Sequence, residues 1–174
     1  TYILRTTCTR ALDVWSARLG RDEMAQRSSV VVTRILLPKR RADILRRRRL
    51  LDFLHEHIDR KLILVSAAAG YGKTSLLVDF AHDTDLPVCW YSLSESDRDL
   101  RVFVEYLIAS LRQQFPGFGA HTEAFLASIG GGNLDPGSVA SVLVNDLYHD
   151  IPDYFVIVLD DYHRGEEEST NFFL

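Results

Sequence analysis

The segment AAAGYGKTS, residues 67–75, lies between the apolar run LILV at 62–65 and the apolar residues LLV at 76–78. An apolar run, a glycine-containing turn and a second apolar stretch predict a strand, a tight loop and a helix. The segment matches a relaxed form of G-x-x-x-x-G-K-[ST], with Ala67 at the first small position. The sequence therefore predicts a phosphate-binding loop between a strand and a helix.

The residue types of this loop explain why it suits a polyphosphate. Gly70 and Gly72 carry no side chain, so the backbone can turn its N–H groups toward phosphate oxygens. The following helix adds the positive end of its dipole. Lys73 is expected to reach the β and γ phosphates, and the Thr74 hydroxyl to bind Mg²⁺. The expected nucleotide-binding residues are Ala67, Ala68, Ala69, Gly70, Tyr71, Gly72, Lys73, Thr74 and Ser75.

A second motif ends the apolar run YFVIVL at 154–159, which is typical of a central parallel strand buried on both faces. Asp160 and Asp161 follow it. In doubly wound α/β sheets, ligands bind at the carboxyl ends of the strands. We expect Asp160 to hold Mg²⁺ opposite Thr74, and Asp161 and Lys73 to be the catalytic residues, with Asp161 orienting or deprotonating a water. The alternative is a pair of acidic residues that merely ends a buried strand.

The hydrophobic pattern along the chain predicts an α/β fold with a doubly wound parallel sheet of the P-loop NTPase type. Helices are expected over 42–59 and 74–82, then from a cap at Ser96 or Asp97 to about Phe115, over 121–128, and from Pro136 onward. Strands are expected over 61–66, 87–92 and 154–159. Residues 130–132, three glycines, read as a connector. Residues 1–28 form an N-terminal extension of unknown role with one helical pattern, and 29–174 form the P-loop domain.

Composition restricts the class of protein further. The chain has 174 residues, 47% of them hydrophobic, which predicts one domain with a sizeable core. The sequence contains neither an apolar run of membrane-spanning length nor a signal-peptide pattern. Cys8 and Cys89 provide neither a disulfide framework nor metal-ligand spacing. We therefore expect a cytoplasmic protein with no membrane partner.

Charge is distributed unevenly between the two parts of the chain. Residues 1–60 contain 14 of the 20 Lys and Arg residues and 7 of the 24 Asp and Glu residues, so the remainder is strongly acidic. A basic segment suggests either nucleic-acid binding or a solvated helix face near a bound polyphosphate. The second reading is favoured, because residues 46–49, four arginines in a row, would spread around a helical turn.

Several motifs together resemble a known family, the ATPase domain of MalT-like, LuxR-type transcriptional activators in the STAND class of P-loop NTPases. The likeness extends from about Thr33 to His163. It rests on R-x-R-L-L at 47–51, AAAGYGKTS at 67–75, WYSL at 90–93, Glu95 and Asp97, Phe103, YLI at 106–108 and VLDDYH at 158–163.

The resemblance implies a switch that binds ATP or ADP with Mg²⁺, hydrolyses ATP slowly and self-associates in its ATP form. It implies contact with DNA only through a C-terminal domain outside this sequence. By position, Arg47 matches an arginine near the adenine or phosphates, and His163 the histidine after the aspartate pair. Glu95 and Asp97 are expected to cap a helix.

The same resemblance implies that a strand following the aspartate pair lies between the strands of the two motifs. Because the sequence ends before it, the domain is expected to be incomplete, with an empty central slot and marginal stability. Two alternatives remain open. One is an NTP hydrolase or kinase whose function is turnover itself, and the other is a STAND signalling scaffold with a non-DNA output domain. Whether the chain is an enzyme stays open, with weak ATPase activity expected.

Overall fold

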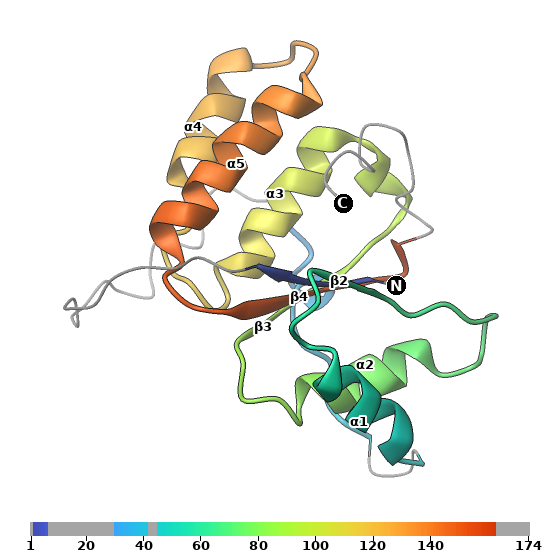
Figure 1. Ribbon diagram of the computed structural model, residues 1–174. Helices are drawn as coiled ribbons and strands as arrows, with labels where there is room; N and C mark the ends of the chain where they lie inside the picture. Colours follow the sequence, from blue (N-terminus) through green and yellow to red (C-terminus); the bar gives the residue numbers. More distant parts are fainter. Residues whose placement is uncertain (1, 7–29, 42–44, 163–174) are drawn as a thin grey trace.

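A computed structural model describes residues 2–6, 30–41 and 45–162, and for residues 2–6 it describes the backbone (Figure 1). A four-stranded sheet lies between two layers of helices. The strands are β1 (Tyr2–Thr6), β2 (Leu62–Leu64), β3 (Val88–Ser92) and β4 (Phe155–Asp160). The helices are α1 (Arg48–Glu56), α2 (Lys73–Ala81), α3 (Leu100–Leu111), α4 (Ala120–Ile129) and α5 (Pro136–Asp150), with short 3-10 helices η2 (Val32–Arg34) and η3 (Glu95–Arg98). Figure 1 shows α3, α4 and α5 on one face of the sheet and α1 and α2 on the other.

The sheet has the order β2-β1-β4-β3 and mixes strand directions. β3 and β4 are parallel, with Ser92 opposite Asp160 at their carboxyl ends. β1 is antiparallel to both of its neighbours, β2 and β4. Strands β2, β3 and β4 therefore run in one direction, and β1 runs in the other.

Two predictions about the sheet are wrong. The sheet is not fully parallel, and the slot between the strands of the two motifs is not empty, because β1 occupies it. Tyr2, Ile3 and Leu4 pair with β2, and all five residues of β1 pair with β4. Unpaired backbone N–H and C=O groups inside a sheet are costly, so a segment that satisfies both neighbouring ladders is stabilised there.

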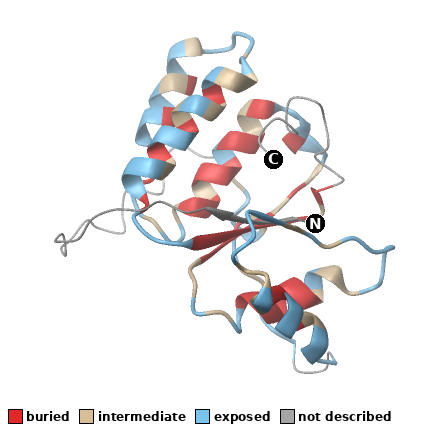
Figure 2. Cartoon of the chain, viewed as in Figure 1, coloured by how far each residue is buried: buried red, intermediate tan, exposed pale blue. Residues whose placement is uncertain are grey.

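Side chains from β3 and β4 alternate between two hydrophobic cores. Cys89 and Tyr91 of β3 pack in the core under α3, α4 and α5, whereas Val88 and Trp90 pack against α1 and α2. β4 alternates in the same way and is buried along its full length, as Figure 2 shows by its red ribbon. The prediction of a central strand buried on both faces is therefore confirmed for residues 155–160.

The β2 strand differs from its prediction in length and burial. It covers three residues rather than six, and it is an edge strand of the described sheet. Its leucines, Leu62 and Leu64, are 41% and 57% exposed. An edge strand has a neighbour on one side only, so its side chains pack less completely than those of β4.

Helix α1 begins later than the sequence predicted. Its first residue is Arg48, and its N-cap residue Arg47 makes no side-chain capping hydrogen bond. Four consecutive arginines oppose a helix start, because cations are unfavourable near the positive end of the helix dipole. Residues 42–44, where the helix was predicted to begin, lie outside the described residues, as does the helical pattern of residues 7–28.

The remaining helices agree closely with their predictions. Asp135 caps α5 by accepting from the backbone N–H of Ser138, and Pro136 is the first residue of that helix. Residues 130–132 lie in the connection between α4 and α5, as predicted. Helix α3 ends at Leu111, four residues earlier than predicted, and its N-cap is Asp99 rather than the predicted Ser96 or Asp97. Among the described residues, no helix is long and apolar enough to cross a membrane.

Candidate functional site

The predicted phosphate-binding loop forms a tight turn between β2 and α2. Gly70 and Gly72 both have left-handed backbones, with φ of 81° and 74°. Glycine adopts this conformation without the strain that a Cβ atom causes. Gly72 is the N-cap of α2, and its carbonyl accepts from the N–H of Leu76 at 3.0 Å. The loop therefore leads straight into the first turn of the helix, where backbone N–H groups are unpaired.

The two sequence motifs meet at the carboxyl end of β4. The Thr74 hydroxyl donates to the Asp160 carboxylate, at 2.9 Å from Oδ2 and 3.1 Å from Oδ1. Thr74 belongs to the first turn of α2, and Asp160 is the last residue of β4. Asp160 is only 4% exposed. The fold thus brings together two oxygen groups that are 86 positions apart in the sequence.

Lys73, the first residue of α2, hydrogen-bonds to the backbone of the loop. Its Nζ donates to the carbonyl oxygens of Ala67 at 2.8 Å and Ala68 at 3.2 Å. An ammonium group has three N–H donors, so these two bonds do not saturate it. The side chain is half-buried, and it carries the positive charge that a phosphate group requires nearby.

Asp161 begins the turn that follows β4. Its φ is 54°, a left-handed backbone that Asp adopts more readily than most residues. Asp161 is half-buried beside the site rather than inside the core. Its assignment to orienting or deprotonating a water stays a prediction.

Arg47 reaches the loop from the start of α1. A methyl group on Gly72 would lie 3.1 Å from Nη2 of Arg47, so the guanidinium rests against the glycine backbone. The tertiary fold therefore puts this guanidinium beside the loop, on the side of α1. Its role toward a ligand stays a prediction.

The remaining loop residues are open to solvent. Ala67, Ala68, Ala69 and Gly70 are exposed, and Tyr71 is 65% exposed. Ser75 is half-buried in the first turn of α2. His163 lies outside the described residues. Among the residues described, no group of three or more His, Cys, Asp or Glu side chains is placed to hold a metal ion.

Sequence reasoning missed Arg34, which organises the neighbouring end of β3. Its Nε donates to the Ser92 carbonyl at 3.0 Å, and its guanidinium pairs with the fully buried Asp97 and stacks over the Tyr106 ring at 4.0 Å. Burial, followed by the nearby Asp97 carboxylate, raises the pKa of Tyr91 above its ordinary value. No motif or periodicity marks Arg34, because its partners lie 58 and 63 positions away.

Asp97 and Ser94 form a capping box on η3, so Asp97 caps this short 3-10 helix and not the longer helix α3 for which it was predicted. Glu95 lies exposed in the first turn of the same 3-10 helix.

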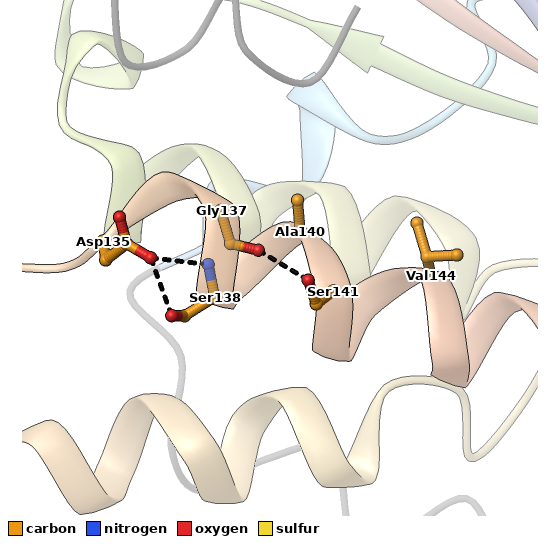
Figure 3. Close-up of a pocket in the computed structure, with 6 residues that line it drawn as sticks. All are labelled: Asp135, Gly137, Ser138, Ala140, Ser141 and Val144. Atoms are coloured by element: carbon orange, nitrogen blue, oxygen red, sulfur yellow. Dashed lines mark hydrogen bonds between the residues drawn. The ribbon is translucent and has the colours of Figure 1, made fainter.

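A shallow depression of about 530 Å³ lies on the outer face of α5 (Figure 3). Its lining residues are Asp135, Gly137, Ser138, Ala140, Ser141 and Val144. The polar groups drawn there bond to one another: Asp135 accepts from Ser138, and Ser141 donates to the Gly137 carbonyl. The Asp135 bond caps the start of α5, and the Ser141 bond lies within the helix, so these polar groups serve α5 itself.

The fold and the site together define a mixed α/β domain in which a glycine-containing loop and the first turn of α2 face the carboxylate that ends β4. Comparison with known proteins relates the chain to a transcriptional regulator. The chain is 31% identical over 152 residues to the HTH-type transcriptional regulator MalT of Yersinia pestis (strain Pestoides F). It is 33% identical over 153 residues to the HTH-type transcriptional regulator MalT of Serratia proteamaculans (strain 568).

Each of these similarities covers 83% of the chain but 16% of the relative, so the chain spans about a sixth of the length of the regulators it matches. No family model matches the chain. No solved structure matches it either. The resemblance to MalT-like proteins is confirmed at this level.

Proposed function

We propose that this chain is a P-loop module of the doubly wound type that binds a nucleoside triphosphate with Mg²⁺, and that it serves as a nucleotide-dependent switch in a transcriptional regulator. The observation that carries the proposal is the hydrogen bond from Thr74 to Asp160 at the carboxyl edge of the sheet. It joins the end of the glycine loop to the end of the buried strand, as a site shared by phosphate and metal requires.

The chain's own groups suit the phosphates. The left-handed turns at Gly70 and Gly72 allow the loop backbone to face a bound anion, and the start of α2 adds unpaired N–H groups and the positive end of its dipole. On binding, Lys73 exchanges the carbonyl oxygens of Ala67 and Ala68 for phosphate oxygens. An ammonium–phosphate bond is charge-assisted, so the exchange favours the ligand.

The donor chemistry of Thr74 and Asp160 fits Mg²⁺. A hydroxyl and a carboxylate are oxygen ligands, which this ion prefers, and Mg²⁺ usually binds through one or two protein groups, water and substrate phosphates. When bound, the ion neutralises charge on the phosphate oxygens. Asp160, held at the end of a buried strand, provides the negative charge, and Thr74 provides the neutral oxygen.

Two further residues complete the proposed site. Asp161, in the turn beyond Asp160, is proposed to orient or deprotonate the attacking water in slow hydrolysis. Arg47, whose guanidinium lies against Gly72, is proposed to bind the nucleotide from the α1 side. An arginine so placed donates in a planar fork, which suits phosphate oxygens.

We propose the switch role on the basis of the nucleotide site, and the similarity to the HTH-type transcriptional regulator MalT supports a regulatory setting for it. We propose that the ATP-bound form self-associates, and that DNA contact belongs to another part of the full protein. A protein of this class would act in the cytoplasm. This module would then report nucleotide state to the rest of the regulator rather than supply a metabolic reaction.

A thermal melt of the 174-residue chain with and without Mg-ATP tests the binding proposal. A ligand at about a hundred times its dissociation constant adds about 2.7 kcal/mol to the stability of the protein that binds it. We expect a clear rise in Tm that Lys73→Ala abolishes. Lys61→Ala is the matched control, because Lys61 is exposed and precedes β2, at the opposite end of that strand from the loop. An equal Tm with and without Mg-ATP would refute nucleotide binding.

A further inference from the structure

We propose that Arg34 is a positioning residue for Asp160: it fixes the turn that follows β3, whose backbone is hydrogen-bonded to Asp160, and thereby sets the Mg²⁺ affinity of the site. The inference rests on the nucleotide and Mg²⁺ binding proposed above. Among the described residues, Arg34 makes no contact with the glycine loop or with Thr74.

Arg34 is held on three sides. Its Nε donates to the Ser92 carbonyl at 3.0 Å, its Nη2 pairs with the carboxylate of Asp97, and its guanidinium stacks on the Tyr106 ring at 4.0 Å. The Arg34 side chain is 16% exposed and that of Asp97 is fully buried. A planar guanidinium can donate to a carbonyl, pair with a carboxylate and stack on an aromatic ring at the same time, which an ammonium group cannot do.

These contacts fix the turn that follows β3. Asp97 also accepts from the backbone N–H of Ser94 at 2.5 Å, so one carboxylate holds both Arg34 and the start of the turn. The Ser92 carbonyl and Asp97 lie at either end of the turn, and Arg34 bridges them. Residues 92–97 therefore form a short segment closed by one buried ion pair.

The closed turn is attached directly to Asp160. Ser92 is the register partner of Asp160 in the parallel β3–β4 pair, and the N–H of Leu93 donates to the Asp160 carbonyl at 2.9 Å. Asp160 in turn accepts from Thr74. A continuous set of hydrogen bonds thus leads from Arg34 through Leu93 to the proposed Mg²⁺ group.

Groups that orient a metal ligand influence affinity without touching the metal, and their loss typically costs about 10- to 100-fold in metal affinity or activity. If Arg34 acts in this way, its loss weakens the Mg²⁺-dependent part of nucleotide binding. If Arg34 only supports the fold, its loss lowers stability and leaves the ratio of affinities with and without Mg²⁺ unchanged. That ratio separates the two roles.

The test measures ATP dissociation constants in Mg²⁺ and in EDTA for the full chain, Arg34→Met, Arg34→Lys and the control Arg112→Met. Arg112 is matched to Arg34, because its Nε donates to the Phe118 carbonyl at 2.7 Å and its guanidinium pairs with Glu123, yet these partners lie on the α3–α4 side. The gain from Mg²⁺ is the factor by which Mg²⁺ tightens ATP binding relative to EDTA. We expect Arg34→Met to reduce this gain by at least about tenfold. Arg34→Lys should lose less, and Arg112→Met should keep the whole gain.

Amide hydrogen exchange of Leu93 supplies a second readout that needs no nucleotide. We expect Arg34→Met to speed exchange at Leu93, and Arg112→Met to leave it unchanged. Equal Leu93 exchange in the two variants overturns the inference whether or not ATP binds. An unchanged Mg²⁺ gain in Arg34→Met, in a chain that binds ATP, also overturns it. A chain that binds no ATP refutes the proposed function, and the Leu93 result then decides whether Arg34 positions Asp160.

Discussion

The Thr74 hydroxyl lies 2.9 Å from Oδ2 of Asp160, in a hydrogen bond that joins the first turn of α2 to the last residue of β4. The bond spans 86 positions of sequence. It is the point at which the two motifs become one site, and its removal has consequences for stability and for Mg²⁺ binding.

Thr74→Val replaces the hydroxyl by a methyl group of similar size. We expect it to destabilise the chain by about 1–2 kcal/mol, because Asp160 is buried and loses a donor to its carboxylate. Chemical denaturation without ligand measures this loss, and ATP binding with and without Mg²⁺ measures the loss of the metal ligand. Thr74→Ser keeps the hydroxyl and is the control. Equal behaviour of the Val and Ser variants would contradict the assignment.

Gly72→Ala and Gly70→Ala separate backbone strain from contact with Arg47. Both glycines have left-handed φ, so each alanine costs about 1–2 kcal/mol in strain. A Cβ at Gly70 meets nothing within 4 Å, whereas at Gly72 it approaches the Arg47 guanidinium. We expect Gly72→Ala to lower Tm further and to weaken ATP binding more.

The double variant Gly72→Ala with Arg47→Ala checks the cause of that difference. It removes the close contact, so its stability should fall only by the strain that Gly70→Ala also shows. A double variant no more stable than the sum of its parts would rule out the contact as the cause.

Leu4→Pro tests whether β1 fills the centre of the sheet. Each residue of a central strand donates to one neighbour or the other, and proline has no N–H to donate. We expect a loss of about 3 kcal/mol or more in urea denaturation. Leu4→Val keeps the backbone donor and should lose far less. If the two variants lose equal stability in urea, β1 does not pair with β2 and β4 in solution. The sheet would then be open between β2 and β4, as the sequence predicted.

Asp146→Asn tests a buried cap between α4 and α5. The Asp146 carboxylate accepts from Thr122 N at 2.9 Å, Thr122 Oγ1 at 2.7 Å and His121 Nδ1 at 2.8 Å. Burial by itself raises the pKa of Asp146, but these hydrogen bonds outweigh it and hold the pKa below its ordinary value. At neutral pH the variant should lose about 1.5–3 kcal/mol, as expected for hydrogen bonds to a charged group.

The pH dependence follows from the direction of that shift. A carboxyl whose pKa is lower in the folded state stabilises the protein above the unfolded pKa, about 3.9, and loses this contribution as pH falls through the folded pKa. The difference between Asp146→Asn and the wild type should therefore be full at pH 7 and shrink below about pH 4. Asp153→Asn, at an exposed position, is the control. A difference independent of pH would contradict the ionised state of Asp146.

Cys89 should be inert in the folded chain. It is fully buried in the core under α3, and burial raises its pKa to about 12. Thiolate is the reactive form, so almost none is present at pH 8. In a Cys8→Ser background, iodoacetamide should label Cys89 only in denaturant, as mass spectrometry would record. Rapid labelling without denaturant would mean that the α3 face of β3 opens readily.

The two motifs could be predicted from sequence because each is local. One is a glycine-containing turn between apolar runs, and the other is an apolar strand that ends in acidic residues. Each is defined by residues within about ten positions of one another. Most element types followed in the same way, as did the start of α5 at Pro136. The late start of α1 was missed, because the charge of residues 46–49 opposes the helix dipole more than the hydrophobic pattern alone indicates.

The sequence by itself determined where the loop, the buried strand and most helices lie, since these depend on periodicity and turn residues. Only the tertiary structure decided which strand stands between β2 and β4, because strand pairing depends on backbone groups distant in sequence, and β1 satisfies both ladders from the chain's first residues. It also decided that Arg34 reaches Ser92 and Asp97, and that Arg47 rests on Gly72. No local sequence pattern encodes these arginine contacts, because their partners lie far away in the sequence.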